Sequence, residues 1–534
     1  MANKFLVGFG AVDLTPNKRI YLHGQFYQRL STHVQSPLLA TAMAIRAGDD
    51  QAVVCSCDLT SIASNLMAEV RNTLKERGLP EQGLDVDKVI LTATHTHSSF
   101  KYRMDSMEST SSTSVPAEML PPGFHMVYDE ETAEIPADEW GNPVSLEAAG
   151  DFSGAGIMTP DESLAWIVER IAQAIAEAWR NCQPMTLISG FGRAPIGMCR
   201  RVVYNDGSAK MWGFTDTATF EELEGGNDSG IELIYCIDET DNLAGIVANI
   251  CCPSQIMEHR LCISSDYWGE TRRRLYKRFG PDLKLVGLGG PGGDQCPRDL
   301  VRWIDPETKV LDPNINHPKP SHLRADPSMF DESGLRTAGR RIATEIIAIY
   351  EELREDKAAW EARVQPAILH HEVDEVQLPL RRVTPEDIAG AKQGIYEYCS
   401  KLDRKEINYR DRAALHVHIG ILKRAALQEE IDLYGFEGHF LRIGNLAMAT
   451  NPFELFLNYG NKIRARSVAE QTFLLQLSCG SGGYLPTKKA EGGGHYSAYV
   501  TSGYVGHEGG DALVRETLSR LRAIWGKGNG TGMR

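Results

Sequence analysis

Apolar residues along the chain recur with two spacings, one typical of strands and one typical of helices. Short apolar runs predict strands at residues 5–9, 52–57, 89–92, 232–237, 244–250, 283–288 and 447–450. Apolar residues three to four positions apart predict helices at residues 65–77, 162–179, 332–353, 411–430 and 512–523. Because strands and helices alternate, the pattern predicts an α/β fold whose sheet is covered by helices on both faces.

Two segments lack this periodicity. Residues 101–159 are rich in Ser, Pro, Gly and acidic residues, and residues 305–327 are rich in Pro and Asn. An irregular stretch as long as the first is typical of an active-site lid or a disordered insert, and its start directly after two histidines favours a lid. No internal repeat or domain linker is evident. We therefore predict a single catalytic domain over residues 1–534, with an irregular insert at about 101–159.

The composition limits the classes of partner. Acidic residues number 71 and basic residues 56, so the net charge is −15. An acidic surface argues against nucleic acid and anionic membranes as main partners. No run reaches the roughly 18 apolar residues of a membrane-spanning helix, and the N-terminus lacks the apolar core of a signal peptide. We expect a cytoplasmic protein with a small-molecule substrate, no nucleic-acid partner and no integral membrane segment; a homo-oligomer stays open.

His95 and His97 are the clearest candidates for chemistry. The sequence Thr-His-Thr-His at 94–97 follows an apolar run at 88–93, so it lies at the end of a predicted strand. Active sites of open α/β sheets gather at such ends. One imidazole would then bind a metal, while the other would serve as an acid or base or contact the substrate. Two histidines that merely cap the strand are the alternative, and the pattern alone does not decide.

Three further segments offer polar side chains at predicted strand ends. Cys251 and Cys252 follow a strand, where a thiolate suits zinc binding or nucleophilic attack, although a buried thiol acts as a small apolar group. The glycine-rich segment 287–297 carries Asp294, but it lacks the nucleotide-binding patterns. Glu454 lies between aromatic residues. If buried it needs a partner such as a metal; a solvent-facing glutamate at a helix start is the alternative.

Aromatic and basic residues in loops complete the candidates. Tyr484 and Tyr496 lie in glycine-rich loops, which often line sites when a rigid scaffold carries them. Arg200 and Arg201 follow a short glycine-containing turn. The alternative is ordinary loop packing for the two tyrosines and a surface position for the two arginines. The eleven cysteines are scattered without a Cys-x-x-Cys pair, so we expect thiols rather than disulfides.

The order and character of these segments resemble the neutral ceramidase family, also called neutral/alkaline non-lysosomal ceramidases. Residues 94–98 are similar to that family's Thr-His-Thr-His-Ser-Gly signature, with Ser99 in place of the glycine. Similar segments span nearly the whole chain, at residues 8–16, 264–266, 293–297, 452–454 and 483–487. The resemblance implies the family's catalytic domain, with a mixed β-sheet core covered by helices. We expect no equivalent of the C-terminal β domain that secreted ceramidases carry.

This resemblance also implies a zinc site. The family hydrolyses the amide bond of ceramide with one zinc ion and a bound water. By matching position, His95, Glu454 and Tyr484 would be zinc ligands. Cys252 falls where the family has its second ligating histidine, and a thiolate there would make the metal a weaker Lewis acid.

Catalytic roles follow from the same resemblance. His97 would be the general base, while Tyr496 and Arg200 would face the carbonyl oxygen as it gains negative charge. Three further residues would support the site or contact the substrate: Asp266, Asp294 and Gln255. The prediction is a zinc-dependent amidohydrolase of a ceramide-like or small N-acylated substrate, which belongs to lipid metabolism if ceramide is the substrate.

Two alternatives stay open. One is a metal-free hydrolase of a sugar or polyol derivative, with Cys252 as nucleophile and His95 or His97 as base. The other is a non-catalytic protein that binds a small molecule on the same scaffold.

Overall fold

A mixed eight-stranded sheet forms the larger half of the molecule. The computed structural model describes residues 4–25, 29–103, 117–126, 152–304, 324–326 and 331–528. The strand order is β18-β16-β15-β10-β1-β5-β6-β7, in which the β16–β18 and β6–β7 pairs are parallel and the others antiparallel. These strands are β1 (Phe5–Asp13), β5 (Leu39–Ala47), β6 (Asp50–Cys57), β7 (Val89–Ala93), β10 (Gln183–Arg193), β15 (Gly230–Ile237), β16 (Leu243–Ile250) and β18 (Lys284–Gly289).

A second sheet of four strands packs against the first. Its strands, in spatial order, are β22 (Leu369–Pro379), β24 (Leu433–Ile443), β25 (Leu446–Thr450) and β27 (Gln471–Leu475). Only the β25–β27 pair is parallel. Leu441, Met448 and Phe473 of this sheet belong to the same buried apolar cluster as strands β1, β5, β6 and β7. The two sheets therefore share one core.

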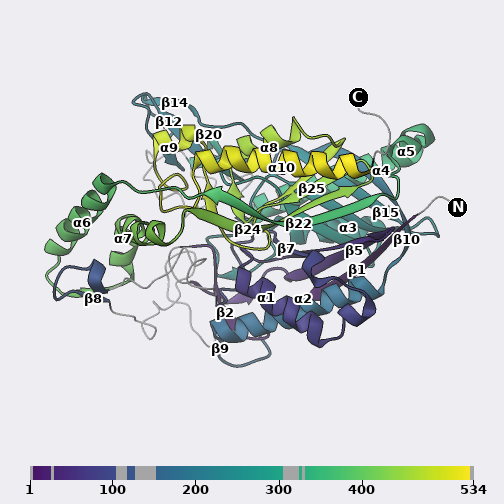
Figure 1. The fold of residues 1–534 in the computed structure, drawn as a ribbon, viewed down its shortest axis with the longest axis horizontal. Coiled ribbons are helices and arrows are strands. Elements are labelled where there is room, and N and C mark those ends of the chain that lie inside the picture. The colour runs from purple at the N-terminus through teal and green to yellow at the C-terminus, as the bar shows by residue number, and fades with distance from the viewer. Residues whose placement is uncertain are drawn as a thin grey trace.

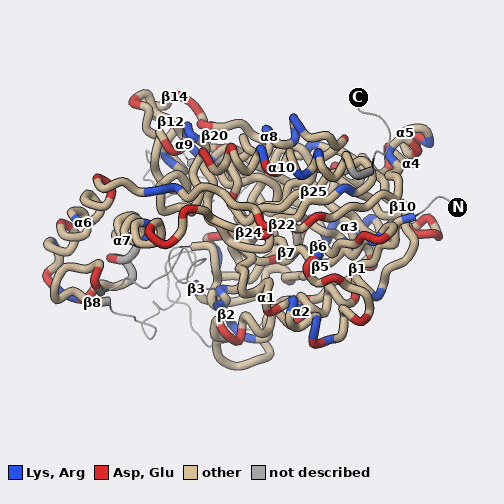
Figure 2. Tube along the Cα trace, viewed as in Figure 1, with Lys and Arg blue, Asp and Glu red and all other residues tan. Residues whose placement is uncertain are grey.

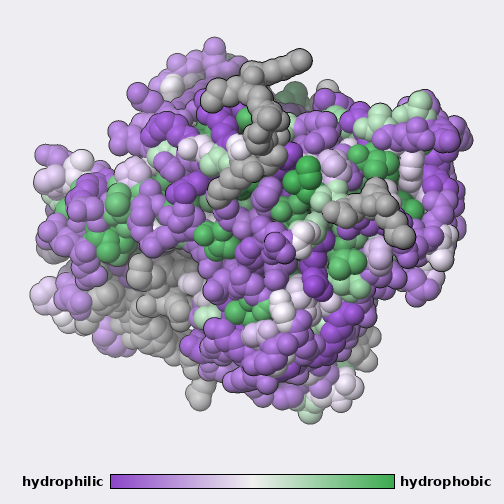
Figure 3. Space-filling model, turned by 45° about the vertical axis from the view of Figure 1, so that its right-hand side comes forward, coloured by the Kyte–Doolittle hydropathy of each residue, from purple (hydrophilic) through white to green (hydrophobic). Residues whose placement is uncertain are grey.

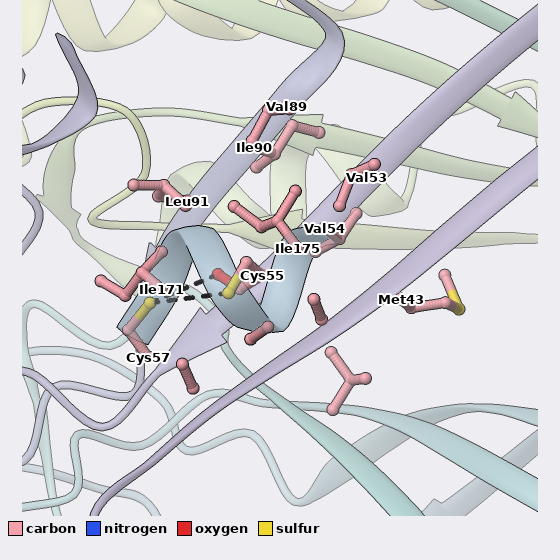
Figure 4. Close-up of a cluster of buried hydrophobic side chains, with 14 of the residues drawn as sticks. Met43, Val53, Val54, Cys55, Cys57, Val89, Ile90, Leu91, Ile171 and Ile175 are labelled. Carbon is pink, nitrogen blue, oxygen red and sulfur yellow. Dashed lines mark hydrogen bonds between the residues drawn. The ribbon is translucent and has the colours of Figure 1, made fainter. Parts of the chain in front are cut away.

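Helices line two opposite sides of these sheets (Figure 1). On one side lie α1 (Ser64–Glu76) and α2 (Pro160–Arg180), and on the other lie α8 (Leu457–Arg464) and α10 (His507–Gly528). Helix α2 starts with a capping box between Thr159 and Glu162, which satisfies backbone groups at its N-terminus. In Figure 4, Ile171 and Ile175 of α2 lie beside Cys55 and Cys57 of β6, so the apolar stripe of the helix covers the sheet.

Other helices extend the core at its ends. Helices α3 (Tyr267–Phe279) and α4 (Asp331–Glu355) pack on each other, and α4 also contacts β10, as does α5 (Lys357–Arg363). Helices α6 (Pro385–Ser400) and α7 (Tyr409–Glu430) form a pair that projects from one end (Figure 1), with a small apolar cluster of its own. No described helix is long and apolar enough to cross a membrane.

Charges of both signs are interspersed over the described chain (Figure 2). The face in Figure 3 is mostly hydrophilic, with apolar residues in small separate patches. Each strand and helix predicted from the apolar pattern is present, and the predicted α/β fold with a mixed sheet is confirmed. The pattern left out β5, β10 and β27, and it did not predict β22. Charged residues interrupt it because one of its faces is partly exposed.

The insert predicted at about 101–159 lies mostly outside the described residues, as does most of the loop at 305–327. The single catalytic domain over residues 1–534 stays a prediction.

Candidate active site

The loop that follows β7 carries both histidines of the sequence motif. Strands β6 and β7 are parallel, so their carboxyl ends meet and bring Thr60 beside His95. His95 has a positive φ of 64°, a strained conformation that its surroundings must hold. The Thr60 hydroxyl donates to the carbonyl of Thr96 at 2.8 Å, and the Thr96 hydroxyl donates to the carbonyl of Ser264 at 2.7 Å. These bonds fix the turn from two sides.

His95 has a defined tautomer. Its Nδ1 lies 2.6 Å from the backbone carbonyl oxygen of Thr60. A carbonyl only accepts, so Nδ1 carries a proton and Nε2 is the ring nitrogen left to bind a metal ion. Nε2 lies 3.4 Å from Oε2 of Glu454. Two ligands at 2.0–2.1 Å from a tetrahedral zinc ion are about 3.4 Å apart, so these two atoms have the separation that such an ion needs.

Glu454 and Tyr484 are brought together by a short parallel strand pair. Strands β26 (Phe453–Leu455) and β28 (Gly483–Leu485) place them directly opposite each other. Arg200 joins them: its Nη2 donates to the Tyr484 hydroxyl at 3.3 Å and lies 3.8 Å from Glu454 Oε2. The backbone at Gly293 approaches closely, since a Cβ there would lie 2.3 Å from the carbonyl oxygen of Glu454. The dense glycines of this segment are therefore needed for close packing around the site.

Electrostatics in this group favour an ionised glutamate and neutral phenols. Burial opposes ionisation of Glu454, but His95, Arg200 and Tyr484 outweigh it and lower the pKa of the carboxyl group. Burial and the nearby glutamate raise the pKa of Tyr484 well above its ordinary value. Burial and the same charge raise the pKa of Tyr496 to about 12. Both phenols are therefore hydrogen-bond donors at neutral pH.

Tyr496 is held in place by Arg201, which sequence analysis left undecided between site and surface. The Tyr496 ring lies edge-on to Tyr484, with ring centroids 5.4 Å apart. The fully buried guanidinium of Arg201 donates to the carbonyls of Tyr496 and Gly494 at 2.9 and 2.8 Å. It also pairs with buried Glu224 at 2.8 Å. Arg201 thus positions the loop that brings Tyr496 to the site.

His97 contacts a carboxylate that sequence analysis missed. Its Nδ1 lies 2.9 Å from Oε2 of Glu258, and both side chains are almost fully buried. Gly24, with φ of 104°, packs its backbone against the His97 ring, where a Cβ would come within 2.5 Å. Buried Arg29 donates to the backbone carbonyls of His97 and Glu258 and fixes the two relative to each other. The one sequence signal was an acidic residue in the polar segment between Cys252 and the next predicted motif.

This pair has the polarity of a general base and its orienting partner. Burial lowers the pKa of His97, and the neighbouring His95 lowers it further, although Glu258 opposes both. Burial opposes ionisation of Glu258, but His97 and the charges of Arg200 and Arg298 lower its pKa overall. A neutral imidazole beside a carboxylate results, as an acid–base role requires.

The three predicted supporting residues lie around Arg200 and the adjoining helices. Gln255 accepts a hydrogen bond from Nη1 of Arg200 at 3.2 Å, so it orients the guanidinium directly. Asp294 accepts the backbone N–H at the start of α8 at 2.9 Å, and its own carbonyl accepts the Arg200 N–H at 2.9 Å. Asp266 accepts two backbone N–H groups at 2.8 Å, one of them at the start of α3. Both aspartates therefore stabilise the backbone around the site by accepting its N–H groups.

Cys252 does not join His95 and Glu454. Its thiol lies in an apolar cluster, 3.5 Å from the Pro253 carbonyl oxygen, and burial raises its pKa well above the ordinary value. Within the described residues, one group of three or more His, Cys, Asp or Glu side chains has all its potential ligand atoms within 4.8 Å of one another, and it does not include Cys252. A protonated, buried thiol is also a poor nucleophile.

The fold of the whole chain is similar to solved ceramidase structures. Neutral ceramidase from Pseudomonas aeruginosa superposes with a TM-score of 0.61 at 16% identity, over 98% of this chain and 75% of that chain. A ceramidase complexed with C2 gives 0.62 at 15% identity, over 98% and 76%. The sequence matches no family profile and no curated protein. The likeness confirms the ceramidase-like fold that the sequence motifs predicted.

Proposed function

We propose that this protein is a metal-dependent hydrolase that cleaves the amide bond of an N-acylated compound, with zinc as its metal. The observation that carries the proposal is the pair formed by Nε2 of His95 and the carboxylate of Glu454, 3.4 Å apart. The likeness of the fold to ceramidases supports an amide substrate, ceramide-like or smaller.

The chain offers an imidazole nitrogen, a carboxylate oxygen and a phenol oxygen to the ion. His95, Glu454 and Tyr484 would hold it, and this N/O donor set suits zinc. Bound zinc supplies Lewis acidity and lowers the pKa of a water toward about 7. Cys252 is left out of this set because its thiol is packed among apolar side chains beside the Pro253 carbonyl and does not come together with His95 and Glu454 within the described residues.

His97 would move the proton. Its Nδ1 lies 2.9 Å from the Glu258 carboxylate, so Nε2 would accept a proton from the attacking water and pass it to the leaving amine. The Glu258 carboxylate fixes the ring and stabilises the imidazolium that forms between these two transfers. Burial of both groups excludes competing bulk water.

Arg200 and Tyr496 would stabilise negative charge on the carbonyl oxygen. Two nitrogens of the Arg200 guanidinium are fixed by Gln255, Gly293 and Tyr484. Its buried Nε makes no hydrogen bond within the described residues, so this N–H can meet a substrate oxygen.

Elemental analysis of the purified full chain, combined with an amine-release assay on short-chain N-acyl substrates, tests the proposal. We expect bound zinc, loss of hydrolysis on chelation and recovery on adding zinc. Exposed His33 provides a matched control, and His33→Ala should retain both metal and turnover. Full hydrolysis by metal-free protein would overturn the proposal.

A further inference from the structure

A second cluster of metal-ligand side chains lies away from the candidate active site. Glu437 and His439 are two residues apart on β24, so their side chains project from the same face of the strand. Cys479 follows β27 and approaches them from the adjoining segment. One potential ligand atom from each residue lies within 4.8 Å of the other two. His439 is fully buried and Cys479 is 8% exposed, whereas the Glu437 side chain is 30% exposed and gives solvent access.

A chain of hydrogen bonds fixes the tautomers in this cluster. Nδ1 of His371 lies 3.0 Å from the backbone carbonyl of Gln51, which only accepts, so Nδ1 carries the proton. Nε2 of neutral His371 therefore accepts from Nδ1–H of His439 at 2.9 Å. Nε2 of His439 is then the ring nitrogen that faces Oε1 of Glu437, 2.8 Å away. A cation, either a proton on the imidazole or a metal ion, is held between this nitrogen and the carboxylate.

The groups around Nε2 of His439 are of the kinds that bind a divalent cation. Arg71 binds both carboxylate oxygens of Glu437, at 2.7 and 2.8 Å, which keeps the carboxylate ionised. The Cys479 thiol beside this pair contacts the Leu91 carbonyl at 3.8 Å, and burial raises its pKa to about 12, so it becomes a ligand only when a bound metal displaces its proton.

We propose that Glu437, His439 and Cys479 form a second metal site, which binds a zinc-type divalent cation. Imidazole nitrogen and thiolate sulfur select zinc or a similar ion over magnesium and calcium, which prefer oxygen ligands. Binding moves the Cys479 thiol proton to solvent, so the sulfur enters as a thiolate. His439 Nε2 and Glu437 Oε1 must separate from 2.8 Å to about 3.4 Å to admit a tetrahedral ion.

The ion would connect elements that also carry the candidate active site. The backbone N–H of Cys479 donates to the Leu91 carbonyl of β7 at 3.0 Å, and β7 leads directly to His95. Cys479 also lies five residues before Tyr484. A metal at Cys479 therefore ties β24 to both segments. It would act as a structural ion, and its existence does not depend on the proposed hydrolase activity.

Cobalt titration of the metal-free full chain tests the second site. A cobalt–thiolate bond gives a near-ultraviolet charge-transfer band, whereas the His95, Glu454 and Tyr484 set contains no sulfur. We expect the band in the wild-type protein and in His95→Ala, and its loss in Cys479→Ser. Cys252→Ser is the matched control and should keep the band. A band that survives in Cys479→Ser, or that disappears in Cys252→Ser, would overturn the proposal, as would a wild-type protein without a band.

Metal content separates this site from the first. We expect Cys479→Ser and His95→Ala each to bind one zinc ion fewer than the wild-type chain, by elemental analysis. Glu437→Gln keeps the size of the side chain and serves if Cys479→Ser fails to fold. It should weaken cobalt binding at least about tenfold. Unchanged cobalt affinity in Glu437→Gln would also count against the site.

Discussion

Two histidine clusters in this molecule use the same device to different ends. In the cluster at the end of β7, His95 donates to the backbone carbonyl of Thr60 and turns its Nε2 toward Glu454. In the cluster on β24, His371 donates to the backbone carbonyl of Gln51 and accepts from Nδ1–H of His439. This turns Nε2 of His439 toward Glu437. In both, a backbone carbonyl at one end determines which histidine nitrogen faces the carboxylate at the other.

The residues around each carboxylate distinguish the two clusters. Glu454 lies near an arginine and two phenols, and the Nε of that arginine makes no hydrogen bond within the described residues. Glu437 is held at both oxygens by Arg71 and adjoins a thiol. Around Glu454, hydrogen-bond donors remain for a substrate. Around Glu437, the arginine donors already bind the carboxylate. Neighbouring residues, rather than the histidine–carboxylate pair, thus separate a candidate catalytic centre from a candidate structural one.

The largest expected effect comes from replacing the two histidines of the first cluster. His95→Ala should lose the active-site metal and nearly all turnover, because it removes a ligand. His97→Ala should keep the metal and lower kcat by about 10²–10⁴-fold, because only the base is removed. Metal content and kcat of both variants check this division of roles. Equal metal loss in the two would contradict it.

Replacing Arg200 with lysine should cause the second-largest loss of activity. The charge is kept, but the planar fork that meets Tyr484, Gln255 and the substrate oxygen is lost. We expect kcat to fall about 10²-fold, as for loss of one oxyanion donor, with unchanged zinc content. A normal kcat would remove Arg200 from the proposed catalytic group. Arg200 would then be a structural partner of a carboxylate, as Arg71 is for Glu437.

Glu258→Gln should have a smaller effect. The amide still fills the space beside His97 but no longer stabilises an imidazolium, so we expect kcat to drop about 10–100-fold. The pH profile of kcat should change as well, which a purely structural role would not produce. An unaltered profile with unaltered kcat would show that His97 acts without this partner.

Cys252 should behave as a buried apolar residue. Because burial raises the pKa of its thiol, we expect no labelling of the folded protein by iodoacetamide at neutral pH. Cys252→Ala should keep metal and turnover and lower stability by about 1–2 kcal/mol through the cavity it leaves. Labelling at Cys252 with loss of activity would instead favour a cysteine nucleophile.

The smallest effect concerns the support of the second cluster. Asp50 pairs with Lys88 and accepts the backbone N–H of His371 at 2.8 Å; despite the opposing effect of burial, these contacts lower its pKa. The stability they provide is present above the ordinary aspartate pKa and is lost as the pH falls through the lower folded-state value. Asp50→Asn should therefore cost about 1 kcal/mol at neutral pH, and thermal melts should show this difference vanishing in acid. A difference that persists in acid would point to packing instead.

Sequence analysis found the first cluster and missed the second for a physical reason. His95 and His97 stand at a strand end, where a polar pair after an apolar run is conspicuous. Glu437 and His439 lie within a strand whose alternation of polar and apolar residues resembles an ordinary half-exposed edge. Cys479 is forty residues further along the chain, so only the packing of β24 against the segment after β27 brings the three together.

The amino-acid pattern alone predicted part of the strands and helices, the α/β fold class and the motif segments that carry His95, Glu454 and Tyr484. Local periodicity and strand-end position are properties of short segments, and a sequence displays them directly. Only the tertiary structure decided which residues meet: Glu258 comes to His97, Arg200 joins Glu454 to Tyr484, and Cys252 stays in the apolar core. Such contacts join segments up to hundreds of residues apart, and their energies depend on burial and distance, which only packing sets.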